Sequence, residues 1–123
     1  MKTSILAYLE ETARRVPEKT AFYDDRESLS FAALLEQAQH VGSYLAQRVA
    51  PRQPVALLLD ARSIRNLPAL FGILYAGCAY APLDIAMPPE RLRLLLTLLS
   101  PAAALVDERG EKAIHACEMA DIP

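Results

Sequence analysis

The sequence predicts an α/β fold in which an N-terminal β-hairpin and helices are followed by a partial parallel sheet with βαβ crossovers. Uninterrupted apolar runs at residues 55–59, 78–83 and 102–106 are typical of strands that are covered on both faces. Segments of about ten to fifteen residues with helical spacing of apolar side chains separate these runs, which is the pattern of a parallel sheet with right-handed crossovers. A length of 123 residues fits one domain.

The first 50 residues predict a helix, a hairpin and a second helix. Thr3 or Ser4 can cap a helix that runs to about residue 15 with an apolar stripe along one side, and Pro17 ends it. Residues 20–23 and 28–30 are expected to pair around the polar turn 24–27. Ser30 is expected to cap the second helix, which runs to about residue 48.

The middle of the chain predicts a strand, a helix and a second strand. After the connector 51–54, residues 55–59 form the first buried strand. The next helix ends near residue 76, and either Ser63 or Asn66 begins it. A start at Asn66 places Pro68 in the first turn, where its missing N–H costs nothing. Gly77 stands where a left-handed helix cap is expected, before the strand 78–83.

The C-terminal third continues the alternation. Residues 88–89 lead into a helix over 90–99, and Arg91 near its start opposes the helix dipole, so an ion pair with Asp84 is expected. Residues 102–106 form the third strand, 107–110 a loop, 111–119 a last helix, and 122–123 the start of another strand. We expect a single incomplete domain over residues 1–123, whose uncovered sheet edge promotes self-association.

Charge, hydropathy and cysteine usage exclude several classes of function. Thirteen Lys and Arg against fifteen Asp and Glu leave no positive excess for a nucleic-acid partner. The uncharged stretch 67–83 contains two prolines and two glycines and is shorter than the roughly 20 residues that span a membrane. Two scattered cysteines without a signal peptide suit a cytoplasmic location and do not form a zinc motif.

Few residues form a recognisable catalytic pattern. The sequence has no GxGxxG after a strand, no GxxxxGK[ST], no GxSxG and no HExxH. Asp60, Asp84 and Asp107 each follow a predicted strand, at the edge that faces the ligand crevice in open α/β sheets, although turn formation or capping is the favoured interpretation. His40, His115 and Cys78 are best interpreted as ordinary helix and core residues.

Residues 74–84 read LYAGCAYAPLD and residues 87–92 read MPPERL. The pair resembles a signature of the adenylate-forming enzymes, roughly LKAGxAYxPLD followed by a proline and ER-L. It looks most like the amino-acid-activating branch, the adenylation domains of nonribosomal peptide synthetases and the D-alanine–carrier-protein ligases. Residues 29–34, LSFAAL, resemble that family's first motif. Tyr75 stands where a lysine is usual, Ala33 where a glutamate is usual, and Cys78 where glycine or alanine is common.

The resemblance implies an N-terminal fragment of an ATP-dependent ligase that converts a carboxylic acid, in this branch an amino acid, to an acyl-adenylate for a carrier-protein thiol. ATP, Mg²⁺ and the carrier's phosphopantetheine would serve the parent enzyme. The family's phosphate loop and catalytic lysine follow the region present here, so we assign no catalytic, cofactor-binding or metal residue and expect an inactive fragment. The matched positions Gly77, Tyr80, Pro82, Asp84 and Arg91 are expected to be structural.

Two other functions stay open from the sequence. The chain could be a free-standing α/β interaction module that docks through its open sheet edge. A flavodoxin-like enzyme that uses Asp60 and Asp107 is a weaker alternative, because the phosphate loop of such enzymes is missing.

Overall fold

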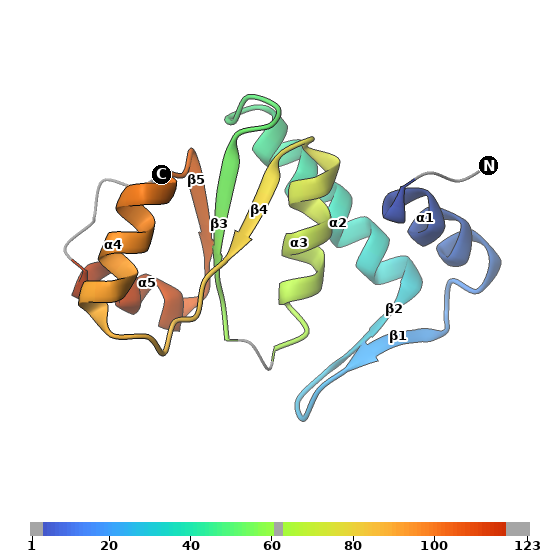
Figure 1. Ribbon diagram of the computed structural model, residues 1–123. Helices are drawn as coiled ribbons and strands as arrows, with labels where there is room; N and C mark the ends of the chain where they lie inside the picture. Colours follow the sequence, from blue (N-terminus) through green and yellow to red (C-terminus); the bar gives the residue numbers. More distant parts are fainter. Residues whose placement is uncertain (1–3, 61–62, 118–123) are drawn as a thin grey trace.

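The computed structural model describes residues 4–60 and 63–117 and has the expected α/β architecture (Figure 1). In chain order the elements are α1 (Ile5–Arg15), β1 (Thr20–Tyr23), β2 (Ser28–Ser30), α2 (Phe31–Ala46), β3 (Pro54–Leu58), α3 (Asn66–Tyr75), β4 (Ala79–Pro82), α4 (Pro89–Leu99), β5 (Ala103–Val106) and α5 (Glu108–Ala116). β1 and β2 form the predicted antiparallel hairpin.

The remaining strands form a three-stranded parallel sheet in the order β4-β3-β5. Val55 of β3 is in register with Tyr80 of β4 and with Ala103 of β5. α3 connects β3 to β4, and α4 then carries the chain from β4 past β3 to the opposite edge (Figure 1). The strand predicted over residues 55–59 is therefore the centre of the sheet.

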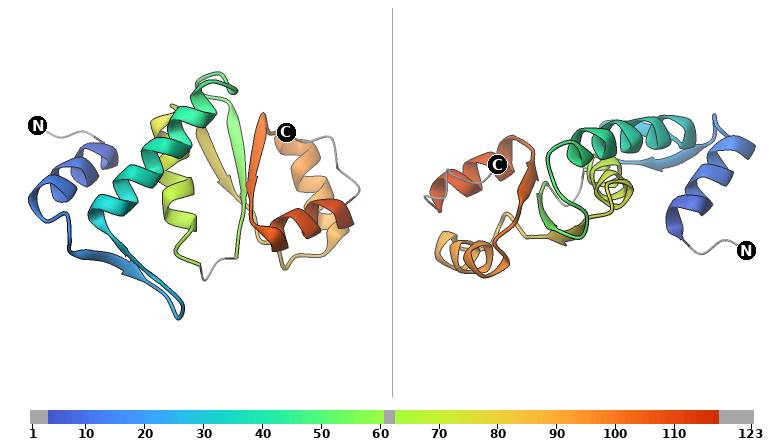
Figure 2. Two further views of the ribbon diagram at one scale, coloured as in Figure 1. Left: turned by 180° about the vertical axis from the view of Figure 1, so that it is seen from behind. Right: turned by 90° about the horizontal axis from the view of Figure 1, so that it is seen from above.

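Helices cover both faces of β3, as its unbroken apolar sequence predicts. Val55 and Leu57 pack in a cluster with α2 and α3, whereas Ala56 and Leu58 pack with α4 and α5. Figure 2 shows these two helix pairs on opposite sides of the sheet. The prediction that β4 and β5 are buried strands is wrong, because each has a neighbouring strand on one side only within the described residues, and Val106 of β5 is 38% exposed.

Local capping explains where most helices begin. The Ala7 N–H donates to Ser4 Oγ (3.2 Å), and the Ala33 N–H donates to Ser30 Oγ (3.1 Å), as expected for N-caps. α3 starts at Asn66, so the placement of its proline in the first turn is confirmed. Thr3, the alternative cap predicted for α1, lies outside the described residues.

The predicted boundaries of α5 are wrong at its start. The helix begins at Glu108, three residues earlier than predicted, because Asp107 caps it. The predicted extension to residue 119 and the strand at residues 122–123 lie outside the described residues. At the end of α3, Gly77 has a φ of 74°, which confirms the left-handed cap.

The N-terminal helix is held to the core by packing and by one phenol. Leu9 and Ala13 of α1 are buried, and the Tyr75 hydroxyl of α3 donates to Glu10 Oε1 (2.7 Å). Burial, and then the bond to the Glu10 carboxylate, raises the pKa of Tyr75 to about 12. Tyr75 thus joins α3 to α1 at a position where adenylate-forming enzymes usually carry a lysine.

Candidate functional site

The carboxyl ends of β3 and β5 lie side by side, at the end of the parallel strands where open α/β proteins bind ligands. Asp60 follows β3, and Asp107 directly follows β5. The Asp60 backbone N–H donates to Asp107 Oδ2 (2.9 Å), and Arg109 Nη1 donates to Asp60 Oδ2 (3.0 Å). Two of the three predicted strand-end aspartates are therefore brought together, with a guanidinium beside them.

Contacts within the chain occupy the Asp107 carboxylate on both oxygens. While Oδ2 accepts from Asp60, Oδ1 accepts from the Gly110 N–H (2.8 Å) and so caps α5. Gly110 is buried, and a Cβ there would lie 1.9 Å from the Leu58 carbonyl oxygen, so α5 starts in direct contact with the end of β3. The carboxylate acts as a structural link between β3, β5 and α5.

Removing this link should destabilise the fold measurably. We expect Asp107→Ala to lower the free energy of unfolding by about 1–2 kcal/mol, because a helix cap and a hydrogen bond to a charged acceptor are both lost. Asp107→Asn keeps acceptor capacity and should cost less. Urea denaturation monitored by circular dichroism compares the two. If the alanine variant were as stable as the parent chain, this assignment would be wrong.

Asp84 lies apart from this cluster. Its Oδ1 accepts from the Ala86 N–H (2.8 Å), which closes the loop after β4. The predicted ion pair between Asp84 and Arg91 is wrong: no described interaction joins them, because Asp84 bonds within its own loop and Arg91 lies exposed in the first turn of α4. A separation of seven residues did not bring the two side chains together.

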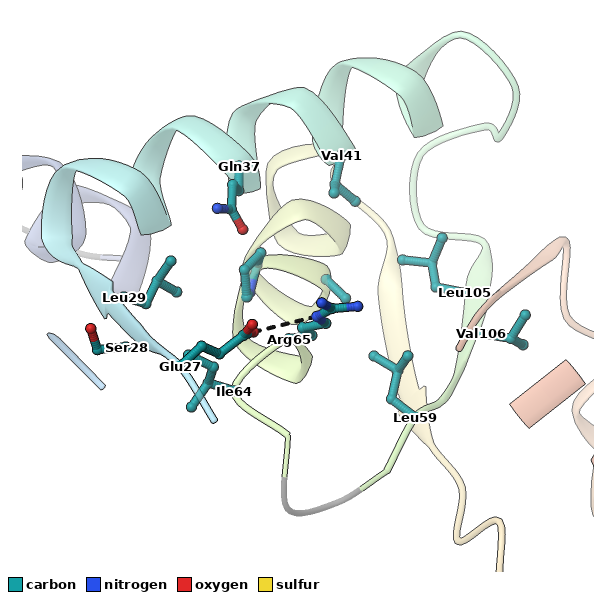
Figure 3. Close-up of a pocket in the computed structure, with 12 residues that line it drawn as sticks. Glu27, Ser28, Leu29, Gln37, Val41, Leu59, Ile64, Arg65, Leu105 and Val106 are labelled. Atoms are coloured by element: carbon teal, nitrogen blue, oxygen red, sulfur yellow. Dashed lines mark hydrogen bonds and ion pairs between the residues drawn. The ribbon is translucent and has the colours of Figure 1, made fainter. Parts of the chain in front are cut away.

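A second candidate feature is a groove of about 540 Å³ between the hairpin, α2, α3 and β5 (Figure 3). Its lining is mainly aliphatic, with one ion pair between Arg65 Nε and Glu27 Oε1 (3.3 Å). The groove residues used below are Leu29, Val41, Leu59, Ile64, Leu105 and Val106. The sequence alone does not predict this groove, because separate segments of the chain build it.

The tip of the hairpin fixes one wall of the groove. Asp24 Oδ1 accepts from the Arg26 and Glu27 N–H groups (both 2.8 Å), and its Oδ2 accepts from the Ile64 N–H before α3 (3.1 Å). These backbone hydrogen bonds hold the pKa of the Asp24 carboxyl below its ordinary value of 3.8. A short polar turn thus connects the hairpin to the segment after β3.

The lowered pKa of Asp24 predicts a pH-dependent contribution to stability. A carboxyl whose pKa is lower in the folded state stabilises it fully above the unfolded value of 3.8, and this is lost as the pH falls through the lower folded pKa. We expect Asp24→Asn to lower the melting temperature at about pH 7, with the difference shrinking below about pH 4. Thermal melts of both proteins across this range measure it. A difference that grows on acidification would contradict the assignment.

The thiols and imidazoles have ordinary environments. Cys78 and Cys117 are buried and unpaired in disulfides, and burial raises the pKa of both thiols. His40 and His115 are exposed on α2 and α5. Among residues 4–60 and 63–117, no group of three or more His, Cys, Asp or Glu is placed to hold a metal ion. No helix within the same ranges is long and apolar enough to cross a membrane.

Comparison with known protein families shows to which family this chain belongs. The family model described as AMP-binding enzyme matches residues 9–122. The chain belongs to the AMP-binding enzyme family. The sequence resemblance to adenylate-forming enzymes is thereby confirmed.

Curated relatives of this AMP-binding chain include large peptide synthetases. Cyclosporin synthetase simA of Tolypocladium inflatum is 35% identical over 111 residues, which cover 90% of this chain and 1% of the synthetase. Gramicidin S synthase 2 of Brevibacillus brevis is 33% identical over 101 residues, which cover 81% of this chain and 2% of that synthase. The chain therefore spans only a small part of the length of these relatives.

Solved structures agree on the fold. VinN has a TM-score of 0.86 at 21% identity, over 98% of this chain and 31% of VinN, and at that identity the likeness concerns the fold alone. The nonribosomal peptide synthetase FmoA3 has a TM-score of 0.83 at 27% identity, over 98% of this chain and 12% of FmoA3.

The family-motif positions of this AMP-binding chain lie on and around β4. Gly77 ends the turn before the strand, Tyr80 is 46% exposed on it, and Pro82 is its last residue, opposite Leu57. Asp84 follows in the closing loop. These positions connect α3 to α4, although a purely structural role for them stays a prediction.

Proposed function

We propose that this chain is one incomplete domain, the N-terminal part of the large portion of an adenylate-forming ligase that activates an amino acid. In the parent enzyme the carboxylate of the amino acid would displace pyrophosphate from ATP to form an acyl-adenylate, and a carrier-protein phosphopantetheine thiol would then take the acyl group and release AMP. The observation that carries this proposal is the similarity of the chain to peptide synthetases, together with its family match. We place the enzyme in the cytoplasm because its two buried cysteines are free thiols.

The described residues do not fit an ATP and Mg²⁺ site. At the carboxyl end of the strands, the Asp107 carboxylate already accepts hydrogen bonds from two backbone N–H groups, and the Arg109 guanidinium is paired with Asp60. The sequence has four glycines, none in a phosphate-cradling loop. We therefore assign ATP, Mg²⁺ and the carrier to the remainder of the parent enzyme and propose that this chain is inactive by itself.

Grafting tests the proposed ligase function. The segment of gramicidin S synthase 2 that matches this chain is replaced by the chain, and amino-acid-dependent exchange of pyrophosphate into ATP is measured. We expect the graft to keep exchange activity within about tenfold of the unaltered synthase, a change of about 1.4 kcal/mol in the barrier. A control graft with residues 74–84 scrambled should lose it. A folded graft without exchange for any amino acid would overturn the proposal.

A further inference from the structure

Helix α4 carries leucines on two sides, and only one of these sides is covered. Leu92 and Leu96 are 1% and 0% exposed and pack in one core cluster with residues of the central strand. Leu94 and Leu98 are 58% and 73% exposed and belong to none of the core clusters of the described residues. Because a helix that is apolar all round is normally buried, the second set of leucines indicates a contact outside this chain.

The exposed side of α4 is a continuous stripe. Positions 91, 94, 95 and 98 have the i, i+3, i+4, i+7 spacing that places side chains on one side of a helix. Arg91, Leu94, Leu95 and Leu98 occupy these positions and together form the outer α4 face. Figure 2 shows α4 at the end of the molecule opposite α1. This spacing is the one with which one helix packs along another.

Arg91 is the charged end of the outer α4 face, and it lacks an acidic partner. Among residues 4–60 and 63–117, no carboxylate forms an ion pair with its exposed guanidinium. Glu90 is adjacent in sequence, but neighbouring residues do not face each other on a helix. A cation in the first turn also opposes the helix dipole. A carboxylate from outside the chain would therefore be attracted both by Arg91 and by the N-terminal end of α4.

A second copy of this chain does not supply that carboxylate. If two α4 helices packed antiparallel about the middle of the stripe, Arg91 of one copy would lie opposite Leu98 of the other, and Leu94 opposite Leu95. In a parallel pair, the two Arg91 side chains would lie together. The first arrangement buries an arginine without an acid, and the second brings like charges together. A different polypeptide therefore complements this face better.

We propose that the outer α4 face binds an amphipathic helix of a partner protein that carries a carboxylate at one end of its apolar stripe. The apolar side chains of the partner pack against Leu94, Leu95 and Leu98, and its carboxylate pairs with Arg91. This role goes beyond the proposed ligase function, and it gives a family-motif residue a partner outside the chain. Because the contact is small, the complex is weak and reversible.

Fluorescence anisotropy with two helical peptides tests the proposal. The probe is a stapled, dye-labelled helix with leucines at i, i+3 and i+4 and a glutamate at i+7, which complements the outer α4 face in antiparallel packing. The control peptide has a lysine in place of the glutamate. We expect the glutamate peptide to bind the purified chain with a dissociation constant of about 10–100 μM, and the lysine peptide to bind at least about tenfold more weakly.

Three variants locate the contact. Arg91→Glu should reverse the preference, so that the lysine peptide binds more tightly than the glutamate peptide. Leu98→Ser should weaken binding of the glutamate peptide at least about tenfold. Arg14→Glu makes the same change of charge on α1, at the opposite end of the molecule, and should leave both affinities unchanged. All three residues are exposed, so the variants should stay folded by circular dichroism.

Other results would contradict the proposal. Equal affinity for the two peptides, or no saturable binding up to about 1 mM, would overturn it. Loss of binding in the folded graft into gramicidin S synthase 2 would mean that the remainder of the enzyme covers this face, and would also overturn it. A dimer in sedimentation equilibrium that Leu98→Ser dissociates would identify a second copy as the occupant and overturn the assignment. Peptide binding by a folded graft without pyrophosphate exchange would support the docking face and contradict the ligase function.

Discussion

Gly110→Ala should lower the free energy of unfolding by about 3 kcal/mol, the upper range for an overpacked core. An added Cβ would lie 1.9 Å from the Leu58 carbonyl oxygen and 3.0 Å from its carbonyl carbon. Leu58 belongs to the central strand, whose backbone is held by strands on both sides. The strand cannot give way, so α5 must shift and weaken the Asp107 cap at Gly110.

Equilibrium urea denaturation of the parent and variant measures this loss. Lys112→Ala is the matched control, because Lys112 is exposed on the same helix and pairs with Glu108 across the surface. It should change stability by less than about 0.5 kcal/mol. A Gly110→Ala variant within about 1 kcal/mol of the parent would mean that α5 does not start against β3.

Gly72→Ala should cost about 2–3 kcal/mol, because α2 and α3 cross closely there. A Cβ at Gly72 would lie 2.4 Å from Val41 Cγ1 and 2.5 Å from Val41 Cβ, and 3.1 Å from the Ala38 carbonyl oxygen. Ala38 and Ile73 are fully buried at this crossing, so the helices must separate to admit the new methyl group. Thermal and urea denaturation measure the effect.

A double variant distinguishes this mechanism from a general loss of helix stability. Gly72→Ala combined with Val41→Gly moves the missing side chain from α3 to α2. It should be more stable, by at least about 1 kcal/mol, than the sum of the two single losses predicts. Additive losses would contradict steric crowding between these two positions. At Gly110 no such partner exists, because the obstacle is the backbone of Leu58.

Local patterns predicted most elements of the fold. Ser4 and Ser30 were identifiable as caps because a hydroxyl residue directly precedes helical apolar spacing. Gly77 was identifiable because a glycine follows the last helical turn. The start of α5 was missed because the segment from Asp107 to Gly110 has the composition of a turn, and only the contact with β3 decides for a helix.

The candidate site was harder to predict, because it depends on which strands are neighbours. All three parallel strands are apolar, so the sequence does not predict which of them is central. It therefore does not predict that Asp60 contacts Asp107 and that Asp84 lies apart. The groove combines residues as distant as Leu29 and Leu105.

Calorimetric titration of the purified chain with ATP and Mg²⁺ tests most directly whether these residues are structural and the nucleotide site lies elsewhere in the enzyme. Because Asp60 and Asp107 are held by contacts within the chain, we predict no saturable heat. A site with a micromolar dissociation constant, lost in Asp107→Ala, would contradict the account and assign nucleotide binding to the carboxyl end of these strands.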